Sequence, residues 1–141
     1  MVVSVSTFYF TKGRVYMAND TKNFKVSEFA CKCGCGMNII DQRVIDMAQA
    51  IREELGVPVK VNSGCRCEKH NARVGGVKGS KHTKGLVADL SCSMGSDVMF
   101  QAVKRLQAQG KLPALDYCIK YKTFIHIDCG GKRKNMWEVR A

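Results

Sequence analysis

The sequence predicts an α+β domain, in which helices pack on an antiparallel sheet. Three observations lead to this fold class: two amphipathic helical patterns, four short runs rich in β-branched and aromatic residues, and a glycine-rich polar segment over residues 62–85. The 141 residues are enough for one domain of ordinary size with a hydrophobic core, and they are too few for two comfortable ones.

Two segments have the apolar spacing of helices that face a core. The first covers residues 41–55, where Asp41 can cap the amino end and Gly56 can end the helix. Its apolar residues recur at helical spacing: Val44, Ile45, Ala48, Ile51 and Leu55. The second covers about residues 96–109. Both apolar stripes are most simply explained as core contacts.

Four short runs have the composition of strands: Val57–Val61, Leu86–Leu90, Tyr117–Tyr121 and Phe124–Asp128. The last run alternates with period two, so His126 and Asp128 should share one face of the sheet while the two isoleucines face the other side. Residues 62–85 are predicted to be a long loop, and such loops in compact domains are usually functional or disordered.

The chain is strongly basic. Lys plus Arg number 23 against 12 Asp plus Glu, which gives a formal net charge of +11, and residues 57–141 carry 16 of the basic residues but only six acidic ones. This charge indicates an anionic partner: nucleic acid, a membrane surface, or an acidic polymer such as a cell wall. Hydrophobic residues make up 45% of the chain, which argues against disorder.

No segment is expected to span a membrane or to direct secretion. The apolar run over residues 1–11 is far shorter than the roughly 20 apolar residues that a bilayer requires. Its positive charges, Lys12 and Arg14, follow the run instead of preceding it, so it does not read as a signal peptide. We therefore expect residues 1–17 to be an extension without a functional role and residues 18–141 to form a single domain.

Eight cysteines are many for a chain without a secretion signal. In a reducing compartment, such clusters indicate metal ligands or buried thiols more often than disulfides. The run Cys31-Lys-Cys-Gly-Cys35 lacks the two-residue spacer of a zinc knuckle and predicts a structural zinc only weakly. Buried thiols, disulfides, and a metal that bridges this run to the segment of Cys65 and Cys67 all stay open.

Three polar residues are candidate metal ligands. Asp89 lies in an apolar strand, where an unpaired carboxylate would be unfavourable, His82 precedes this strand, and His126 lies in the last strand. Two histidines and a carboxylate suit a catalytic zinc, which lowers the pKa of a bound water towards ~7 and polarises a carbonyl. Asp128, on the same strand face as His126, is the candidate base for the water proton.

Four motifs resemble those of the zinc D-Ala-D-Ala carboxypeptidases. They are Ser63-Gly-Cys-Arg-Cys-Glu-Lys-His-Asn71, Val74-Gly-Gly-Val-Lys-Gly-Ser-Lys-His82, Gly85-Leu-Val-Ala-Asp89 and Phe124-Ile-His-Ile-Asp-Cys-Gly130. Relatives of these enzymes include the phage L-alanyl-D-glutamate endolysins and the vancomycin-resistance D-Ala-D-Ala dipeptidases. The segment from Phe24 to Cys35 also resembles small phage and bacterial members, so the resemblance covers roughly residues 24–130.

The resemblance implies a hedgehog/DD-peptidase-like zinc peptidase fold and names the residues of its site. It makes His82, Asp89 and His126 the ligands of a zinc ion, in agreement with the chemical argument. Arg66 falls at the arginine that binds a substrate carboxylate, a task that suits a bidentate guanidinium. Ser80 falls at the serine beside the first ligand, which usually contacts the substrate or supports the ligand.

One departure from the family pattern concerns the catalytic base. Many relatives have an acidic residue three positions before the second histidine, where this chain has Thr123. We expect Asp128 to take the role of base and Arg66 to be the second catalytic residue. His70 matches no ligand position, and a hydrogen-bonding or surface role is expected for it.

The sequence therefore predicts zinc-dependent hydrolysis of a peptide bond in the peptidoglycan stem or cross-link, by a carboxypeptidase or an endolysin-type endopeptidase. The expected partners are a peptidoglycan peptide and, by charge, anionic wall polymers, with the protein itself a monomer. A chain that is made in the cytoplasm and acts on the wall after release or export fits a phage or prophage endolysin.

Two other functions stay open on the sequence alone. The first is a wall-binding domain that has the same fold without catalysis, because Thr123 removes one usual base position. The second is a basic zinc-binding nucleic-acid module built on the run from Cys31 to Cys35. Aromatic residues do not interleave with the basic ones and no recognition helix is apparent, so nucleic acid is not the favoured partner.

Overall fold

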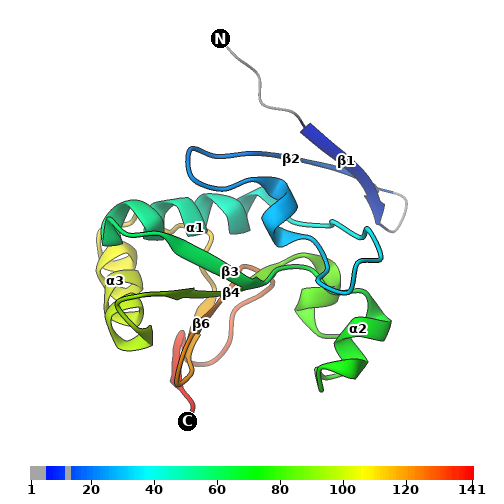
Figure 1. The fold of residues 1–141 in the computed structure, drawn as a ribbon. Coiled ribbons are helices and arrows are strands. Elements are labelled where there is room, and N and C mark those ends of the chain that lie inside the picture. The colour runs from blue at the N-terminus through cyan, green and yellow to red at the C-terminus, as the bar shows by residue number, and fades with distance from the viewer. Residues whose placement is uncertain (1–5, 12–13) are drawn as a thin grey trace.

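The computed structural model describes residues 6–11 and 14–141, and its centre is a five-stranded sheet in the order β3-β4-β6-β5-β7 (Figure 1). The strands are β3 (Val59–Ser63), β4 (Val87–Cys92), β5 (Tyr117–Lys120), β6 (Ile125–Asp128) and β7 (Trp137–Val139). The helices are η1 (Val26–Phe29), α1 (Gln42–Leu55), α2 (Glu68–Arg73), η2 (Lys81–Lys84) and α3 (Ser96–Ala108), where η denotes a 3-10 helix. The predicted α+β class is confirmed.

The sheet is mixed, and the prediction of a purely antiparallel sheet was wrong in one strand. Strands β3, β4, β6 and β5 pair antiparallel, as expected, but β7 pairs parallel to β5. After β6 the chain passes to the outer edge of β5 and runs in the direction of β5. The three residues of β7 are too few to show a strand pattern in the sequence.

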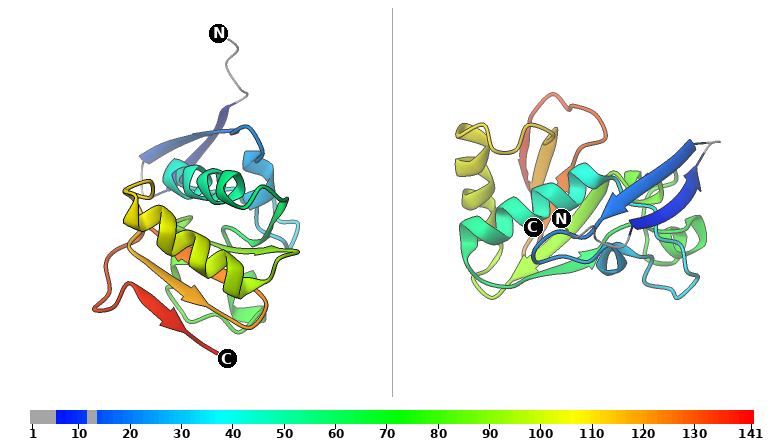
Figure 2. Two further views of the ribbon diagram at one scale, coloured as in Figure 1. Left: turned by 90° about the vertical axis from the view of Figure 1, so that its left-hand side faces the viewer. Right: turned by 90° about the horizontal axis from the view of Figure 1, so that it is seen from above.

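The two predicted long helices are confirmed, and their ends lie close to the predicted ones. The Asp41 carboxylate caps α1 by accepting a hydrogen bond of 2.9 Å from the Arg43 N–H, and Gly56 ends the helix in the left-handed conformation. Helices α1 and α3 lie side by side and cover one face of the sheet (Figure 2). Their apolar stripes form the core together with the inward side chains of β3, β4 and β6.

Side-chain alternation in β6 separates the core from the opposite face of the sheet. Ile125 and Ile127 belong to the hydrophobic core, while His126 and Asp128 lie on the face that α1 and α3 do not cover. The adjacent strand continues this division, because Ala88 and Leu90 also belong to the core. The uncovered face therefore carries the polar groups of two central strands.

The segment over residues 62–85, predicted to be one long loop, contains the end of β3 and two short helices. Helix α2 is capped by the Cys67 sulfur, which accepts a hydrogen bond from the His70 N–H, and η2 is capped by the Ser80 hydroxyl, which accepts one from the His82 N–H. Helices of six and four residues are too short to show amphipathic periodicity, so the sequence analysis missed them.

Strands β1 (Ser6–Thr11) and β2 (Arg14–Asn19) form a separate antiparallel pair, which crosses the predicted boundary at residue 17. The rest of the predicted extension, residues 1–5 and 12–13, lies outside the described residues. Within the part of the chain that the structure describes, no helix is long and apolar enough to cross a membrane.

Candidate active site

Asp89 and His126 are direct partners across β4 and β6, on the face of the sheet that the long helices leave open. The His126 Nδ1 lies 2.8 Å from the Asp89 Oδ1. The sequence placed both residues in strands, and the register of the two strands brings their side chains together because paired residues point to the same face.

His82 reaches the same point from η2 and is buried. Its Nδ1 lies 2.8 Å from the Gly64 carbonyl oxygen, and since a carbonyl can only accept, this contact places the ring proton on Nδ1. The lone pair of Nε2 is thereby left free, and Nε2 lies 3.4 Å from the Asp89 Oδ2. A backbone carbonyl that fixes the tautomer in this way is the usual support of a metal-binding histidine.

The three side chains can together hold a metal ion. His82, Asp89 and His126 each offer a ligand atom, and these atoms lie within 4.8 Å of one another. Two imidazoles and one carboxylate are a donor set that zinc accepts in catalytic sites, where a further position stays open for water or substrate. The residues present therefore fit the zinc ion that the sequence predicted.

The buried Asp89 carboxylate is surrounded by donors. Burial alone would raise its pKa, but the hydrogen bond with His126 and the proximity of the His82 ring outweigh burial and hold the pKa of Asp89 well below its usual range. The Arg66 guanidinium, 3.5 Å from the Asp89 Oδ2, adds a positive charge on the third side. Asp89 is therefore ionised, as a metal ligand must be.

Arg66 is held in place by neutral polar side chains as well as by Asp89. Its Nε donates to the Ser63 hydroxyl at 3.1 Å, and its Nη1 donates to the Asn71 Oδ1 at 3.2 Å. Asn71 is buried and also donates to the Val77 carbonyl oxygen. Sequence reasoning gave Asn71 no role, although its place in the His-Asn pair of the first motif was a usable signal.

Asp89 and Asp128 contact opposite edges of the His126 ring. The Asp128 Oδ2 is 3.2 Å from the His126 Nε2, and the Asp128 Oδ1 accepts a hydrogen bond of 2.7 Å from the Gly130 N–H. Burial raises the pKa of Asp128, but contacts with His126, the Tyr117 hydroxyl and the Gly130 N–H outweigh it and lower the pKa below its usual range. The imidazole of His126 thus lies between two ionised carboxylates.

These residues open into one cleft with a volume of about 590 Å³. All the site residues predicted from the sequence line it: Arg66, Ser80, His82, Asp89, His126 and Asp128. The cleft also has basic residues that sequence reasoning did not assign to it, namely Lys81, Arg133 and Arg140. The Arg133 guanidinium lies 4.1 Å from the centre of the Tyr117 ring, so Arg133 contributes to the cleft wall.

The surroundings of Gly64 explain why the first motif has a glycine at this position. A Cβ at this position would lie 2.4 Å from the Phe29 carbonyl oxygen, and the Gly64 carbonyl is the acceptor that orients His82. We expect Gly64→Ala to destabilise the fold by about 1–3 kcal/mol, because only backbone atoms could move to admit the methyl group. Denaturant-induced unfolding measures this change, and an unaltered unfolding free energy would contradict the close approach.

The site combines two histidines and one carboxylate that could hold a metal ion, at the side of a basic cleft. Residues 22–128 match the family Peptidase M15, and the chain belongs to that family. M15 peptidases are metal-dependent and usually contain zinc, so the chain is a metallopeptidase by family. A comparison with curated proteins gave no match.

Proposed function

We propose that the protein is a zinc-dependent peptidase that cleaves a peptide bond in the stem or cross-link of peptidoglycan, as a carboxypeptidase or an endolysin-type endopeptidase. The observation that carries the proposal is the convergence of His82, Asp89 and His126 in one cleft with Arg66. Membership of the M15 family supports the reaction, and the basic cleft supports an acidic peptide as the substrate.

His82, Asp89 and His126 hold the metal in this proposal. When bound, zinc polarises the carbonyl of the scissile bond and lowers the pKa of water, which makes an amide hydrolysable at neutral pH. The protein prepares this centre by keeping His82 in one tautomer and Asp89 ionised.

Asp128 accepts the proton that is released when water attacks the carbonyl. Among the described residues that line the cleft, it is the only carboxylate besides the ligand Asp89. Its ionised form is required for this role, and its contacts keep it ionised. Through its contact with the His126 Nε2, the same carboxylate also orients the ring of a ligand.

Arg66 binds a carboxylate of the substrate. Three of its N–H groups point to Ser63, Asn71 and Asp89, which fixes the plane of the guanidinium beside the metal ligands. Peptidoglycan stems carry free carboxylates on D-amino acids, and a planar guanidinium can bind such a group through two parallel hydrogen bonds. Ser80, at the start of η2, lines the cleft next to His82 and is the second substrate contact.

We expect Arg66→Lys to raise KM about 10- to 100-fold for a peptide with a free carboxylate, because an ammonium cannot reproduce the bidentate contact. Hydrolysis of synthetic stem peptides with a free or an amidated carboxyl end measures the effect. Wild-type protein and the variant should differ far less on the amidated peptide. An equal loss on both peptides would indicate that Arg66 supports the site without binding the carboxylate.

The reaction itself is tested on purified bacterial cell wall. Zinc-loaded protein should release D-alanine or stem-peptide fragments and generate new amino groups, while protein treated with a chelator should not. The absence of any release by correctly folded, zinc-loaded protein would contradict the proposed activity. Wall binding without release would instead indicate a wall-binding domain of the same fold.

A further inference from the structure

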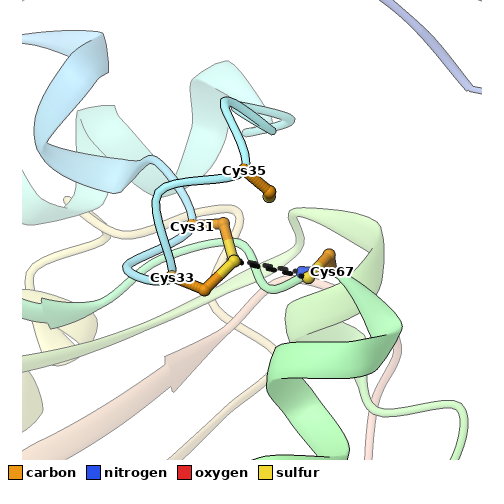
Figure 3. Close-up of side chains that lie close together, drawn as sticks. All are labelled: Cys31, Cys33, Cys35 and Cys67. Carbon is orange, nitrogen blue, oxygen red and sulfur yellow. Dashed lines mark hydrogen bonds between the residues drawn. The ribbon is translucent and has the colours of Figure 1, made fainter.

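We infer that Cys31, Cys33, Cys35 and Cys67 form a second metal site, which binds zinc through four thiolates and serves to fix the structure. The four cysteine side chains gather at one point (Figure 3), and their sulfurs lie within 4.8 Å of one another. They form a group separate from that of His82, Asp89 and His126. This site has no part in the hydrolysis described above, and the proposal does not depend on that reaction.

Two of the distances between the sulfur atoms match zinc coordination and do not match disulfides. The Sγ atoms of Cys31 and Cys33 are 3.5 Å apart, and those of Cys33 and Cys67 are 3.7 Å apart. A tetrahedral zinc with Zn–S bonds of about 2.3 Å separates its sulfur ligands by about 3.8 Å. A disulfide would require about 2.05 Å between the two sulfurs.

Backbone amides point at the sulfurs of the cluster. The N–H groups of Cys67, Met37 and His70 donate to the sulfurs of Cys31, Cys35 and Cys67, at 3.4, 3.4 and 3.3 Å. A sulfur that accepts hydrogen bonds from amides is stabilised as a thiolate, which is the form that binds a metal. Three of the four cysteines therefore have the support that metal-binding thiolates receive from their surroundings.

The chain brings the four residues together from two distant segments. Cys31, Cys33 and Cys35 come from the loop after η1, where Gly34 has a positive φ of 83° and lets the chain turn tightly. Cys67 lies 34 positions after Cys33, at the start of α2. The cluster has no two-residue spacer, so its ligand set is visible only in the folded chain.

The buried cysteines elsewhere have different surroundings. Cys129 donates its S–H to the Leu86 carbonyl oxygen, which is the behaviour of a buried thiol. By contrast, Cys35 is exposed, which gives an ion access to the cluster.

A metal at this cluster would fix the segment that carries Arg66. The Cys65 N–H donates to the Phe29 carbonyl oxygen and the Arg66 N–H donates to the His82 carbonyl oxygen, each at 2.9 Å. Binding of Cys67 and Cys31 to one ion would close this segment against the loop after η1. Zinc binding displaces one proton from each thiol to solvent and leaves the complex with a net charge of −2. Soft thiolates select zinc over magnesium and calcium.

The test counts metal ions and identifies their ligands. Native mass spectrometry, with a competing chelator present, should find two zinc ions per wild-type chain and one in Cys35→Ser, Cys67→Ser and His126→Ala. Cobalt substitution should give sulfur-to-metal charge-transfer absorption in wild type and in His126→Ala, and lose it in both cysteine variants. Cys92→Ser, in a partly buried cysteine outside the cluster, is the matched control and should behave as wild type.

Cys35→Ser is the decisive variant, because its side chain is exposed and the substitution leaves the core intact. It should also lower the thermal unfolding temperature in zinc, with a far smaller effect after chelation. A zinc count in both cysteine variants equal to that of the wild-type chain, iron in place of zinc, a wild-type mass that shows disulfides, or unchanged charge-transfer absorption in both cysteine variants would each overturn the proposal. None of these outcomes depends on whether the protein cleaves peptidoglycan.

Discussion

Replacement of Asp128 by asparagine is expected to lower kcat about 10²- to 10⁴-fold while the protein still folds and binds zinc at His82, Asp89 and His126. The amide keeps the size of the side chain and can still contact the His126 ring, but it cannot take up a proton. Asp128 has the position for this role because it is an ionised carboxylate in the cleft and is separated from the ligand Asp89 by one imidazole ring.

Two measurements separate proton transfer by Asp128 from a purely orienting role. If Asp128 only orients His126, the substitution should weaken metal binding about 10- to 100-fold, and saturating zinc should restore kcat. If Asp128 accepts the proton, kcat stays low at saturating zinc. Asp116→Asn is a matched control, because Asp116 accepts a hydrogen bond from Gly131 but does not line the cleft. Full activity of Asp128→Asn at limiting zinc would exclude both roles.

Removal of the metal from the His82, Asp89 and His126 site is expected to lower activity by about 10³-fold or more, because the polarisation of the carbonyl contributes several kcal/mol to the barrier. His126→Ala removes one of the three ligands and should give the same loss. Added zinc should restore the chelated wild-type protein but not this variant. His70→Ala, in the one histidine outside the ligand set, should retain activity and zinc.

A chelator would remove metal from the cysteine cluster as well as from the cleft. The activity of the His126 variant is therefore the measurement that assigns the reaction to the cleft. His126→Ala leaves all four cysteines in place, and its loss of activity can be assigned to the cleft. Peptidase activity that persists in folded His126→Ala would show that this centre does not catalyse the reaction.

The central strands and the residues that converge in the cleft could be predicted because their signals are local. Period-two alternation in residues 124–128 places His126 opposite the core isoleucines, and the structure retains this alternation. The carboxylate of Asp89 stood out because its neighbours are apolar. The pairing of Asp89 with His126 depends on the register between β4 and β6, which the sequence alone does not determine.

The features that the sequence analysis missed or left open depend on contacts between distant segments. Cys67 joins the cluster of Cys31 only through the packing of α2 against the loop after η1. Arg133 enters the cleft because the chain after β6 crosses Tyr117 on its way to β7. Helices α2 and η2 depend on single side-chain caps rather than on a periodic pattern.

The most direct test of the proposed function is mass analysis of peptidoglycan digested by the zinc-loaded protein. We expect fragments that arise from cleavage between two amino acids of the stem or cross-link, with a free carboxylate near the cut for Arg66 to bind. These fragments should be absent from a digest with His126→Ala. Cleavage between sugars, or between the sugar and the first amino acid of the stem, would contradict the account, as would an intact polymer after incubation with folded, zinc-loaded protein.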